Sequence, residues 1–232
     1  MTHHTIRAIG DIHGEADALA EVLQVEDAAP HFLFLGDLVD RGPDSAGVLQ
    51  TVLSLVQTAR ATLVRSNHDD KLFRHLKGNK VTLNAELEET LRQLAAHPHG
   101  ELITTNFQAL YSQAPHWLTI GTYTFAHGAF HPDMLELASP AEGINRKARE
   151  MLAWLSLYGE STMRMEDDKP TRTYDWVDTI SAGHTVVVGH DARSWDAPFE
   201  CTGALSGAAI FMDTGCGKGG PLSWRDFEVK TT

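Results

Sequence analysis

Short apolar runs alternate with helix-like patterns through the first third of the chain. Three runs have the length and apolar character of buried strands: residues 6–9, 31–35 and 61–64. Three further segments repeat apolar side chains every three or four positions, as amphipathic helices do: residues 15–25, 48–56 and 69–76. The resulting strand–helix–strand–helix–strand order predicts an α/β sheet.

The middle of the chain is more helical. Leu87, Leu91 and Leu94 form one apolar stripe, and the sequence His-Pro-His-Gly at residues 97–100 is a turn signal. We therefore expect residues 79–116 to form a helical insert. This insert is either a wall or lid over a site or a plain structural helix pair. No internal repeat or linker divides the chain, so we expect a single domain over its 232 residues.

The pattern returns to strands after the insert. Two short strands are expected on either side of Gly121. A helix should cover residues 142–158, and the polar residues 163–173 should form a loop. Three later runs predict strands, the last of them at a sheet edge: residues 185–188, 208–212 and 224–229.

Composition narrows the class of protein. A hydrophobic fraction of 42% and a charged fraction of 22% are typical of a globular domain. The sequence has no apolar run near the roughly 20 residues that a membrane span needs, and its N-terminus has no secretory-signal pattern. Cys201 and Cys216 are too few for a disulfide framework, so we expect a cytoplasmic protein. The formal net charge of -12 disfavours an extended nucleic-acid-binding surface.

Polar clusters follow five of the expected strands. They contribute these candidates: Asp11 and His13; Asp37, Asp40 and Arg41; Asn67 and His68; His127; and His190. Ligands of α/β sheets gather beyond the carboxyl ends of the strands, so the shared placement predicts one site. A single Asp or His at a strand end is more simply a turn former or a helix cap. Five such clusters together favour a shared function.

The residue types in these clusters indicate metal chemistry. Two aspartates, one asparagine and three histidines offer oxygen and imidazole ligands for Mn, Fe, Zn or similar ions: Asp11, His13, Asp37, Asn67, His127 and His190. Six ligands favour two ions that share a carboxylate. Such a pair lowers the pKa of a bound water from about 15.7 towards neutrality, which makes hydroxide available for attack on phosphorus.

Three further residues complete a hydrolytic site. Arg41 offers a planar, permanently charged fork for phosphoryl oxygens. His68 can protonate a leaving alkoxide, and Asp40 can fix its tautomer by accepting a ring N–H. A cysteine-based phosphatase is excluded, because Leu222 stands where a Cys-x5-Arg loop beginning at Cys216 needs arginine. The sequence also contains no Asp-x-Asp pair and no Arg-His-Gly sequence.

The five motifs, in this order, resemble the calcineurin-like metallophosphoesterase superfamily. The resemblance implies an α/β fold of two β-sheets flanked by helices. It implies two divalent ions, one held by Asp11, His13 and Asp37 and the other by Asp37, Asn67, His127 and His190. Manganese is the expected metal, with Fe, Zn or Ni as alternatives. By the same likeness, His68 serves acid catalysis, while Arg41 and Asn67 bind the phosphate.

Within the superfamily the chain resembles three branches. These are phage-type and bacterial Ser/Thr protein phosphatases, symmetrical dinucleoside tetraphosphate hydrolases, and the phosphatase domain of bacterial polynucleotide kinase-phosphatase. Residues 71–78, 157–162 and 213–216 are most similar to the last of these. This match implies that Asp213 holds Arg41 or the substrate, and the alternative is an ordinary carboxylate in a turn at a strand end.

Two positions depart from the family pattern. Ser66 stands where the family usually has glycine, and Asp191-Ala192 replaces the common Thr-Pro after the last histidine. A carboxylate at residue 191 could alter metal choice or weaken the binding of a dianionic phosphate. These departures put the substrate class in question more than the activity.

We therefore expect a metal-dependent phosphoesterase that cleaves phosphate monoesters and extends to diesters or 2′,3′-cyclic phosphates. A phosphoprotein and a dinucleoside polyphosphate remain open as substrates. A non-catalytic metal- or phosphate-binding module is the weaker alternative, because every expected ligand and His68 are present. The five tryptophans are interpreted as packing groups: Trp117, Trp154, Trp176, Trp195 and Trp224.

Overall fold

The apolar runs of the first third pair into a four-stranded sheet. In the computed structural model, which describes residues 2–24, 30–139, 143–166 and 169–231, the strand order is β11-β1-β2-β3. The three N-terminal strands are parallel, and the C-terminal strand adds antiparallel to the free side of β1 as the expected edge strand. The strands are β1 (Thr2–Ile9), β2 (His31–Phe34), β3 (Ala61–Leu63) and β11 (Trp224–Thr231).

Both faces of β2 are buried, which explains its unbroken apolar sequence. Phe32 and Phe34 point into a core shared with the neighbouring helices. Leu33 and Leu35 point the other way and pack in a second core that contains Phe125 of the opposite sheet. Side chains alternate between the two faces of a strand, so one short run supplies both cores.

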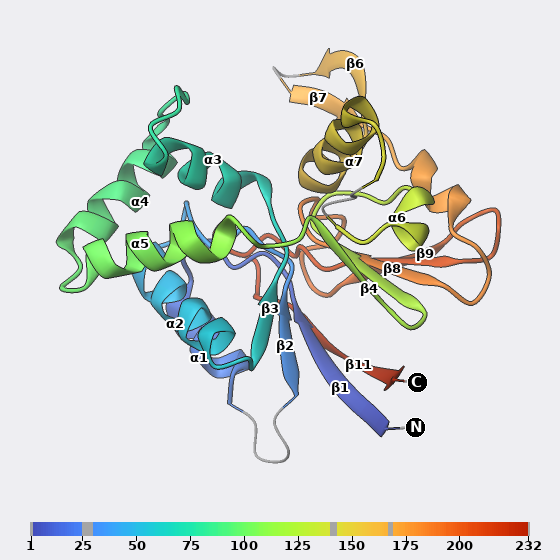
Figure 1. The fold of residues 1–232 in the computed structure, drawn as a ribbon, viewed down its shortest axis with the longest axis horizontal. Coiled ribbons are helices and arrows are strands. Elements are labelled where there is room, and N and C mark those ends of the chain that lie inside the picture. Colours follow the sequence, from blue (N-terminus) through green and yellow to red (C-terminus); the bar gives the residue numbers. More distant parts are fainter. Residues whose placement is uncertain (1, 25–29, 140–142, 167–168, 232) are drawn as a thin grey trace.

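Helices cover the outer face of this sheet (Figure 1). They are α1 (Ala16–Val22), α2 (Ser45–Gln57), α3 (Asn67–Leu76), α4 (Ala85–Ala96) and α5 (Gly100–Tyr111). The Asp44 side chain caps α2 by accepting the Gly47 N–H. The helix expected to reach residue 25 ends at Val22, and residue 25 lies outside the described residues. The two expected helices of the insert are present, and they pack on α2 and on each other.

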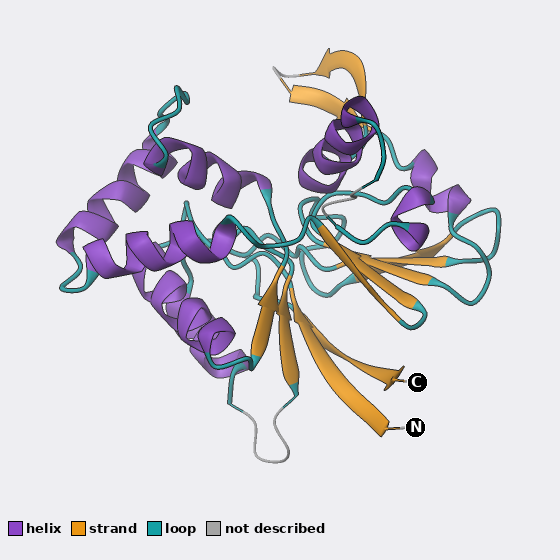
Figure 2. Cartoon of the chain, viewed as in Figure 1, coloured by secondary structure: helices purple, strands orange, loops and turns teal. Residues whose placement is uncertain are grey.

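The second half of the chain forms a five-stranded sheet in the order β4-β5-β8-β10-β9. Its strands are β4 (Trp117–Ile120), β5 (Tyr123–Ala126), β8 (Thr185–Val188), β9 (Phe199–Thr202) and β10 (Ala208–Phe211). The hairpin around Gly121 and both later buried strands agree with the sequence pattern. The short helix α6 (Asp133–Glu136), helix α7 (Arg146–Tyr158) and the 3-10 helix η1 (Asp175–Thr179) lie beside this sheet. Figure 2 shows the two sheets meeting along one side, with helices outside them.

The loop expected over residues 163–173 is wrong. This segment forms an antiparallel hairpin of β6 (Ser161–Glu166) and β7 (Lys169–Arg172), with a register irregularity between Ser161 and Met165. The hairpin pairs with neither main sheet and stands apart from them in Figure 1. The hairpin supplies no residue to the described hydrophobic cores, and its mostly polar sequence has too few apolar residues to predict strands.

Helix α7 also begins later than expected, at Arg146 rather than at residue 142, which lies outside the described residues. The reason is local, because the Asn145 side chain accepts the Ala148 N–H and caps the helix there. None of the helices within the described residues is long and apolar enough to cross a membrane.

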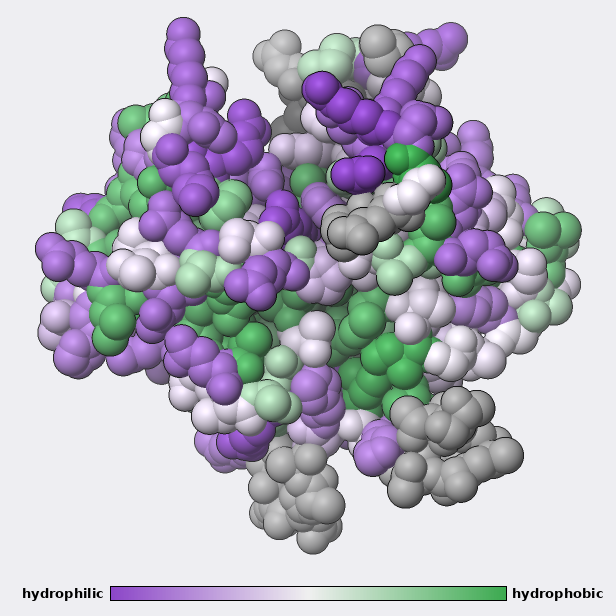
Figure 3. Space-filling model, viewed as in Figure 1, coloured by the Kyte–Doolittle hydropathy of each residue, from purple (hydrophilic) through white to green (hydrophobic). Residues whose placement is uncertain are grey.

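Apolar residues gather near the middle of the face drawn in Figure 3, while polar residues cover its outer rims. Two hollows lie along the edge strands of the two sheets. One, of about 390 Å³, is lined by β3 and α5, and the other, of about 380 Å³, by β4 and α6. Pro115 lines both hollows.

Candidate active site

The loops that follow five strands converge where the two sheets meet (Figure 1). A cavity of about 350 Å³ opens at this point. It is lined by Asp37, Arg41, Asn67, His68, Arg172, His190, Asp191 and Lys218. The parallel strands β1, β2 and β3 bring their carboxyl ends to one edge, and β5 and β8 do the same in the other sheet. The predicted convergence of the motifs is therefore present in the fold.

Asp37 stands at the centre of the cluster. Its Oδ2 lies 3.5 Å from His13 Nε2, and its Oδ1 lies 3.4 Å from His127 Nε2. It belongs to two groups of potential metal ligands, one with His13 and His68 and the other with His127 and His190. The two carboxylate oxygens of Asp37 thus face two different sets of imidazoles.

Asn67 and Asp11 complete the cluster. The Asn67 side-chain oxygen lies 2.8 Å from His127 Nε2 and 3.0 Å from His190 Nδ1. Asp11 is the most distant member, with Oδ2 3.9 Å from His13 Nε2. Its Oδ1 accepts the His190 backbone N–H at 3.1 Å, which ties the end of β1 to the end of β8. All six predicted metal-ligand residues therefore lie together.

Backbone carbonyls fix the orientation of two imidazoles. His13 Nδ1 donates to the Val39 carbonyl at 2.9 Å, and His127 Nδ1 donates to the Leu35 carbonyl at 2.9 Å. Each Nε2 then carries a lone pair that faces Asp37. Burial lowers the pKa of His13 to about 3 and also lowers the pKa values of His127 and His190. These imidazoles are therefore neutral, as metal ligands must be.

The two buried carboxylates of the cluster have pKa values shifted in opposite directions. Burial raises the pKa of Asp11 well above its usual value, and the nearby Asp213 and Asp37 carboxylates raise it further. Burial would also raise the pKa of Asp37, but the surrounding histidines lower that pKa below its ordinary value. Carboxylate oxygens and imidazole nitrogens in one buried cluster are a donor set that fits divalent transition-metal ions.

His68 is held by a chain of hydrogen bonds that begins in the helical insert. His68 Nδ1 donates to Asp40 Oδ2 at 2.7 Å, and the Thr90 hydroxyl of α4 donates to Asp40 Oδ1 at 2.7 Å. Burial lowers the pKa of His68, but the Asp37 and Asp40 carboxylates outweigh burial and leave the pKa above its usual value. The same helix holds the loop through Gln93, whose side-chain amide donates to the Gly42 carbonyl.

Arg41 points into the cavity. Its terminal nitrogens contact His13 Nε2 and, at 3.2 Å, His68 Nε2. Its buried Nε has no hydrogen-bond partner among the described residues and lies 3.6 Å from the Glu86 carboxylate of α4. The guanidinium is therefore close to the acid–base candidate and has donors that the protein itself does not fully use.

Backbone strain is concentrated in the site. Five of the non-glycine residues with positive φ are site residues: His13, Asp37, Asp40, Arg41 and His190. Such conformations are unfavourable for residues with a Cβ and persist only where the surrounding structure holds them. Glycine is required at Gly189, because a Cβ there would lie 2.2 Å from Asp11 Oδ1.

The structure explains the Ser66 departure. The Ser66 hydroxyl accepts the Asp37 backbone N–H at 2.7 Å and donates to Asp69 Oδ2 at 2.8 Å. The hydroxyl fits because Gly36 is opposite, where a Cβ would lie 2.3 Å from Ser66 Cβ. Asp69 Oδ1 in turn accepts the Leu38 N–H at 3.0 Å. Ser66 therefore supports the loop that carries the central carboxylate.

Sequence reasoning missed Arg172 and Lys218, which line the cavity. Arg172, on the hairpin strand β7, contacts His190 Nε2 at 2.6 Å, and its Nε pairs with Asp191 at 3.3 Å. The second departure, Asp191, therefore faces an arginine. The sequence around Arg172 is polar and does not indicate a site. Arg172 reaches the cavity only because the hairpin folds over it.

Asp213 does not line the cavity, unlike the predicted phosphate-binding residues Arg41 and Asn67. Its Oδ1 accepts the Gly215 N–H at 2.8 Å, as a turn carboxylate does. Within the described ranges, no hydrogen bond or ion pair joins Asp213 to Arg41. The Asp213 carboxylate nevertheless raises the pKa of Asp11.

Two other features do not form a catalytic site. The Cys216 thiol is buried and donates to the Ile12 carbonyl, and burial raises its pKa to about 12.

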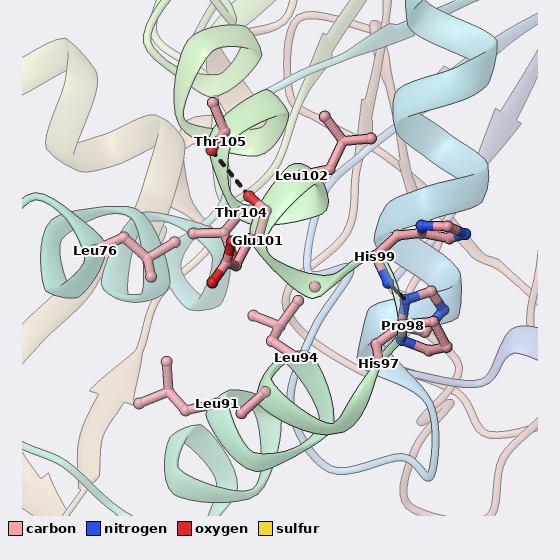
Figure 4. A pocket seen from close by; sticks show the side chains of 12 residues that line it. Leu76, Leu91, Leu94, His97, Pro98, His99, Glu101, Leu102, Thr104 and Thr105 are labelled. Carbon is pink, nitrogen blue, oxygen red and sulfur yellow. Dashed lines mark hydrogen bonds between the residues drawn. The ribbon is translucent and has the colours of Figure 1, made fainter.

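A hollow of about 960 Å³ lies at the turn between α4 and α5. In Figure 4 the Glu101 carboxylate lies away from the His97 and His99 rings, and these residues form none of the potential metal-ligand groups in the described chain.

Comparisons with known proteins agree with this site. The model of the calcineurin-like phosphoesterase family matches residues 4–194. The asymmetrical bis(5′-nucleosyl)-tetraphosphatase PrpE of Anoxybacillus flavithermus is 32% identical, over 93% of this chain and 87% of the relative. The protein of the same name from Bacillus subtilis is 30% identical, over 96% and 91%.

Solved structures share the fold. The crystal structure of a candidate diadenosine tetraphosphatase is 26% identical, has a TM-score of 0.63, and is matched over 97% of this chain and 89% of that one. A serine/threonine phosphatase of Saccharomyces cerevisiae has a TM-score of 0.60 at 16% identity, over 99% and 81%, and this likeness concerns the fold alone. The predicted superfamily and its two-sheet α/β fold are confirmed. The chain belongs to the calcineurin-like phosphoesterase family and is a metal-dependent hydrolase of phosphoester bonds.

Proposed function

We propose that this chain is a two-metal hydrolase whose ions are held by the cluster around Asp37. The observation that carries the proposal is the central carboxylate, whose two oxygens face His13 on one side and His127 on the other at about equal distances, 3.5 and 3.4 Å. One ion would be held by Asp11, His13 and Asp37, and the other by Asp37, Asn67, His127 and His190. Manganese is the first metal to test, followed by Fe, Zn and Ni.

The bound ions would supply an activated water and neutralise phosphoryl charge. The residues of the chain supply the rest. His68 Nε2 faces the cavity while Nδ1 is fixed by Asp40, so the ring can give a proton to the leaving oxygen. Its raised pKa favours the protonated form that an acid needs.

Cations around the cavity would bind the phosphoryl oxygens. Arg41 comes from the loop after β2, Arg172 from the hairpin strand β7, and Lys218 from the loop after β10. The terminal nitrogens of the Arg41 guanidinium contact the Nε2 atoms of two imidazoles, and these donors can bind a phosphate in a bidentate manner instead. Asn67 offers its amide from the same wall.

For the substrate, we propose a dinucleoside tetraphosphate that is cleaved asymmetrically into a nucleoside triphosphate and a nucleoside monophosphate. The support is that the PrpE relatives carry this activity in their name and match nearly the whole chain. The expected hydrolysis of monoesters, diesters or 2′,3′-cyclic phosphates, symmetrical cleavage and a phosphoprotein substrate remain alternatives that the same site can serve.

Product analysis with diadenosine tetraphosphate tests the proposal. We expect ATP and AMP as products in the presence of Mn, whereas symmetrical cleavage would give two ADP. Asp37→Asn, which keeps the size of the side chain, should abolish turnover. Calorimetry should detect two Mn ions per chain in the wild type and fewer in the variant. If no divalent metal supported hydrolysis of this substrate, a phosphoester or a phosphopeptide, the proposal would be wrong.

A further inference from the structure

The C-terminal end of α7 adjoins the catalytic cavity. The Tyr158 carbonyl accepts a hydrogen bond from Arg172, which lines that cavity. A Cβ built at Gly159 would lie 3.5 Å from the Arg172 guanidinium and 3.6 Å from His190 Cδ2. The last turn of α7 therefore lies directly beside a predicted metal ligand and a cation of the cavity.

One face of α7 carries large apolar side chains that the fold does not bury. Trp154 is 61% exposed and Met151 is 42% exposed. The rings of Trp154 and Tyr158 stand one helical turn apart, with centroids 4.2 Å apart and planes inclined by 34°. Of the five tryptophans interpreted as packing groups, Trp117 and Trp176 are buried, whereas Trp154, Trp195 and Trp224 are exposed.

Tyr158 faces the opposite wall of the site. Burial and then the Asp70 carboxylate raise the pKa of Tyr158, while the Arg74 guanidinium lowers it. Asp70 and Arg74 belong to α3, the helix that begins with Asn67 and His68. In Figure 1, α3 and α7 stand on either side of the loops that form the site. Tyr158, on which the Trp154 ring packs, therefore lies between α7 and α3 beside the site.

We propose that Trp154 and Tyr158 form a stacking platform for one base of a nucleotide substrate, whose phosphates lie in the adjoining cavity. This inference rests on the proposed function. The two regions would bind different parts of the nucleotide. Arg41, Arg172 and Lys218 face the cavity and would bind the phosphates, and the aromatic pair offers a nearby π surface for the base. The centroids of the two rings are only 4.2 Å apart, so the pair offers one π surface at the end of α7 that a nucleoside attached to a bound phosphate would reach. Base stacking on aromatic side chains is independent of sequence, so the platform would accept different bases.

Kinetics on matched ligands test the platform. Diadenosine tetraphosphate carries bases, and inorganic tetraphosphate, measured as a competitive inhibitor, carries the phosphates alone. In Trp154→Ala we expect KM for diadenosine tetraphosphate to rise roughly fivefold or more relative to KI for inorganic tetraphosphate. Trp154→Phe should recover most of the affinity, and Trp154→Leu should not, because it restores apolar area without a ring.

Leu102→Ala is the matched control. Leu102 is 59% exposed near the start of α5 and does not line the catalytic cavity, so its loss should leave the ratio of KM to KI unchanged. An unchanged ratio in Trp154→Ala would overturn the inference while leaving the proposed function intact. So would sedimentation showing that Trp154→Ala dissociates an oligomer without a change in that ratio, because the face would then join copies of the chain.

A binding measurement separates this inference from the proposed function. Titration with α,β-methylene-ADP should quench tryptophan fluorescence in the wild type, and this quenching should be lost in Trp154→Phe. Quenching without hydrolysis of any dinucleoside polyphosphate would refute the proposed function and keep the platform. Hydrolysis without quenching at Trp154 would refute the platform alone.

Discussion

The hydrogen bond between Thr90 and Asp40 gives a direct test of whether the helical insert takes part in catalysis. Thr90 is completely buried in α4, and its hydroxyl donates to Asp40 Oδ1 at 2.7 Å. Asp40 Oδ2 accepts the His68 Nδ1–H. The substitution Thr90→Val keeps the shape of the side chain and removes its hydroxyl, which donates to Asp40 and also lies within hydrogen-bond distance of the Asp40 N–H and the Ser45 hydroxyl.

The expected effect follows from the partners that remain. A hydrogen bond to a charged group contributes about 1.5–3 kcal/mol to stability. The Asp40 N–H, which lies 3.1 Å from the Thr90 hydroxyl, keeps the Ser45 hydroxyl at 3.2 Å as an acceptor. The buried Ser45 hydroxyl, however, loses the Thr90 oxygen 3.3 Å away as its own acceptor. We therefore expect the whole of that range, about 1.5–3 kcal/mol.

Thr90→Val should lower both the free energy of unfolding and kcat. A less restrained Asp40 fixes His68 less well, and a transition-state loss of about 1.4 kcal/mol is a tenfold fall in kcat. KM should change little, because neither Thr90 nor Asp40 lines the cavity in which the substrate would bind. Urea unfolding of metal-free protein measures the first effect, and steady-state kinetics at saturating Mn measures the second.

Thr105→Val is the matched control. Its hydroxyl donates to the Glu101 carbonyl on the exposed side of α5, so the same chemical change should have almost no effect there. If Thr90→Val kept its stability within about 0.5 kcal/mol and kcat within about twofold, the reasoning would be refuted. The insert would then be a plain structural helix pair with respect to the site.

Three further predictions concern residues around the site and the second sheet. Ser66→Ala should lower the free energy of unfolding by about 1–3 kcal/mol in urea titrations, because the buried Asp37 N–H loses its acceptor. Asp191→Asn should lower KM for a polyphosphate substrate severalfold with little change in kcat, since it releases Arg172 from an ion pair; an increase in KM would contradict this. Burial lowers the pKa of His116 to about 4, so the unfolded chain binds that proton first and stability falls as pH drops from about 6.5 to 4. His116→Gln should reduce this slope by up to about 1.4 kcal/mol per pH unit in unfolding measurements on metal-free protein.

The sequence allowed the family and the frame of the fold to be predicted, because their signals are local. The run from residue 31 to residue 35 is apolar on both faces, and the parallel pairing of β1, β2 and β3 follows from helices that separate them. Each polar cluster comes directly after a strand. Since strand ends of a parallel sheet meet at one edge, their convergence could be expected without coordinates.

Other contributors act through contacts between distant positions. Thr90 reaches Asp40 across 50 residues, and nothing near residue 90 distinguishes that threonine from any other in an amphipathic helix. The position of Arg172 could not be predicted for a related reason. Its hairpin is mostly polar and supplies no residue to the described hydrophobic cores, so the sequence does not indicate these strands. Ser66 could be recognised as a departure, but its role depends on Gly36 lying opposite it.

The charge of the protein bears on how a polyanionic substrate is held. A net charge of -12 repels such a substrate at long range, so association should depend on contacts inside the cavity rather than on electrostatic steering. Within the cavity, Arg41, Arg172 and Lys218 lie close enough to bind phosphoryl oxygens directly. These cations would bind any phosphate group. Specificity among phosphorylated substrates should therefore depend on surfaces beside the cavity. The unburied aromatic face of α7 adjoins the cavity, and it is there that a nucleotide would differ from a phosphopeptide.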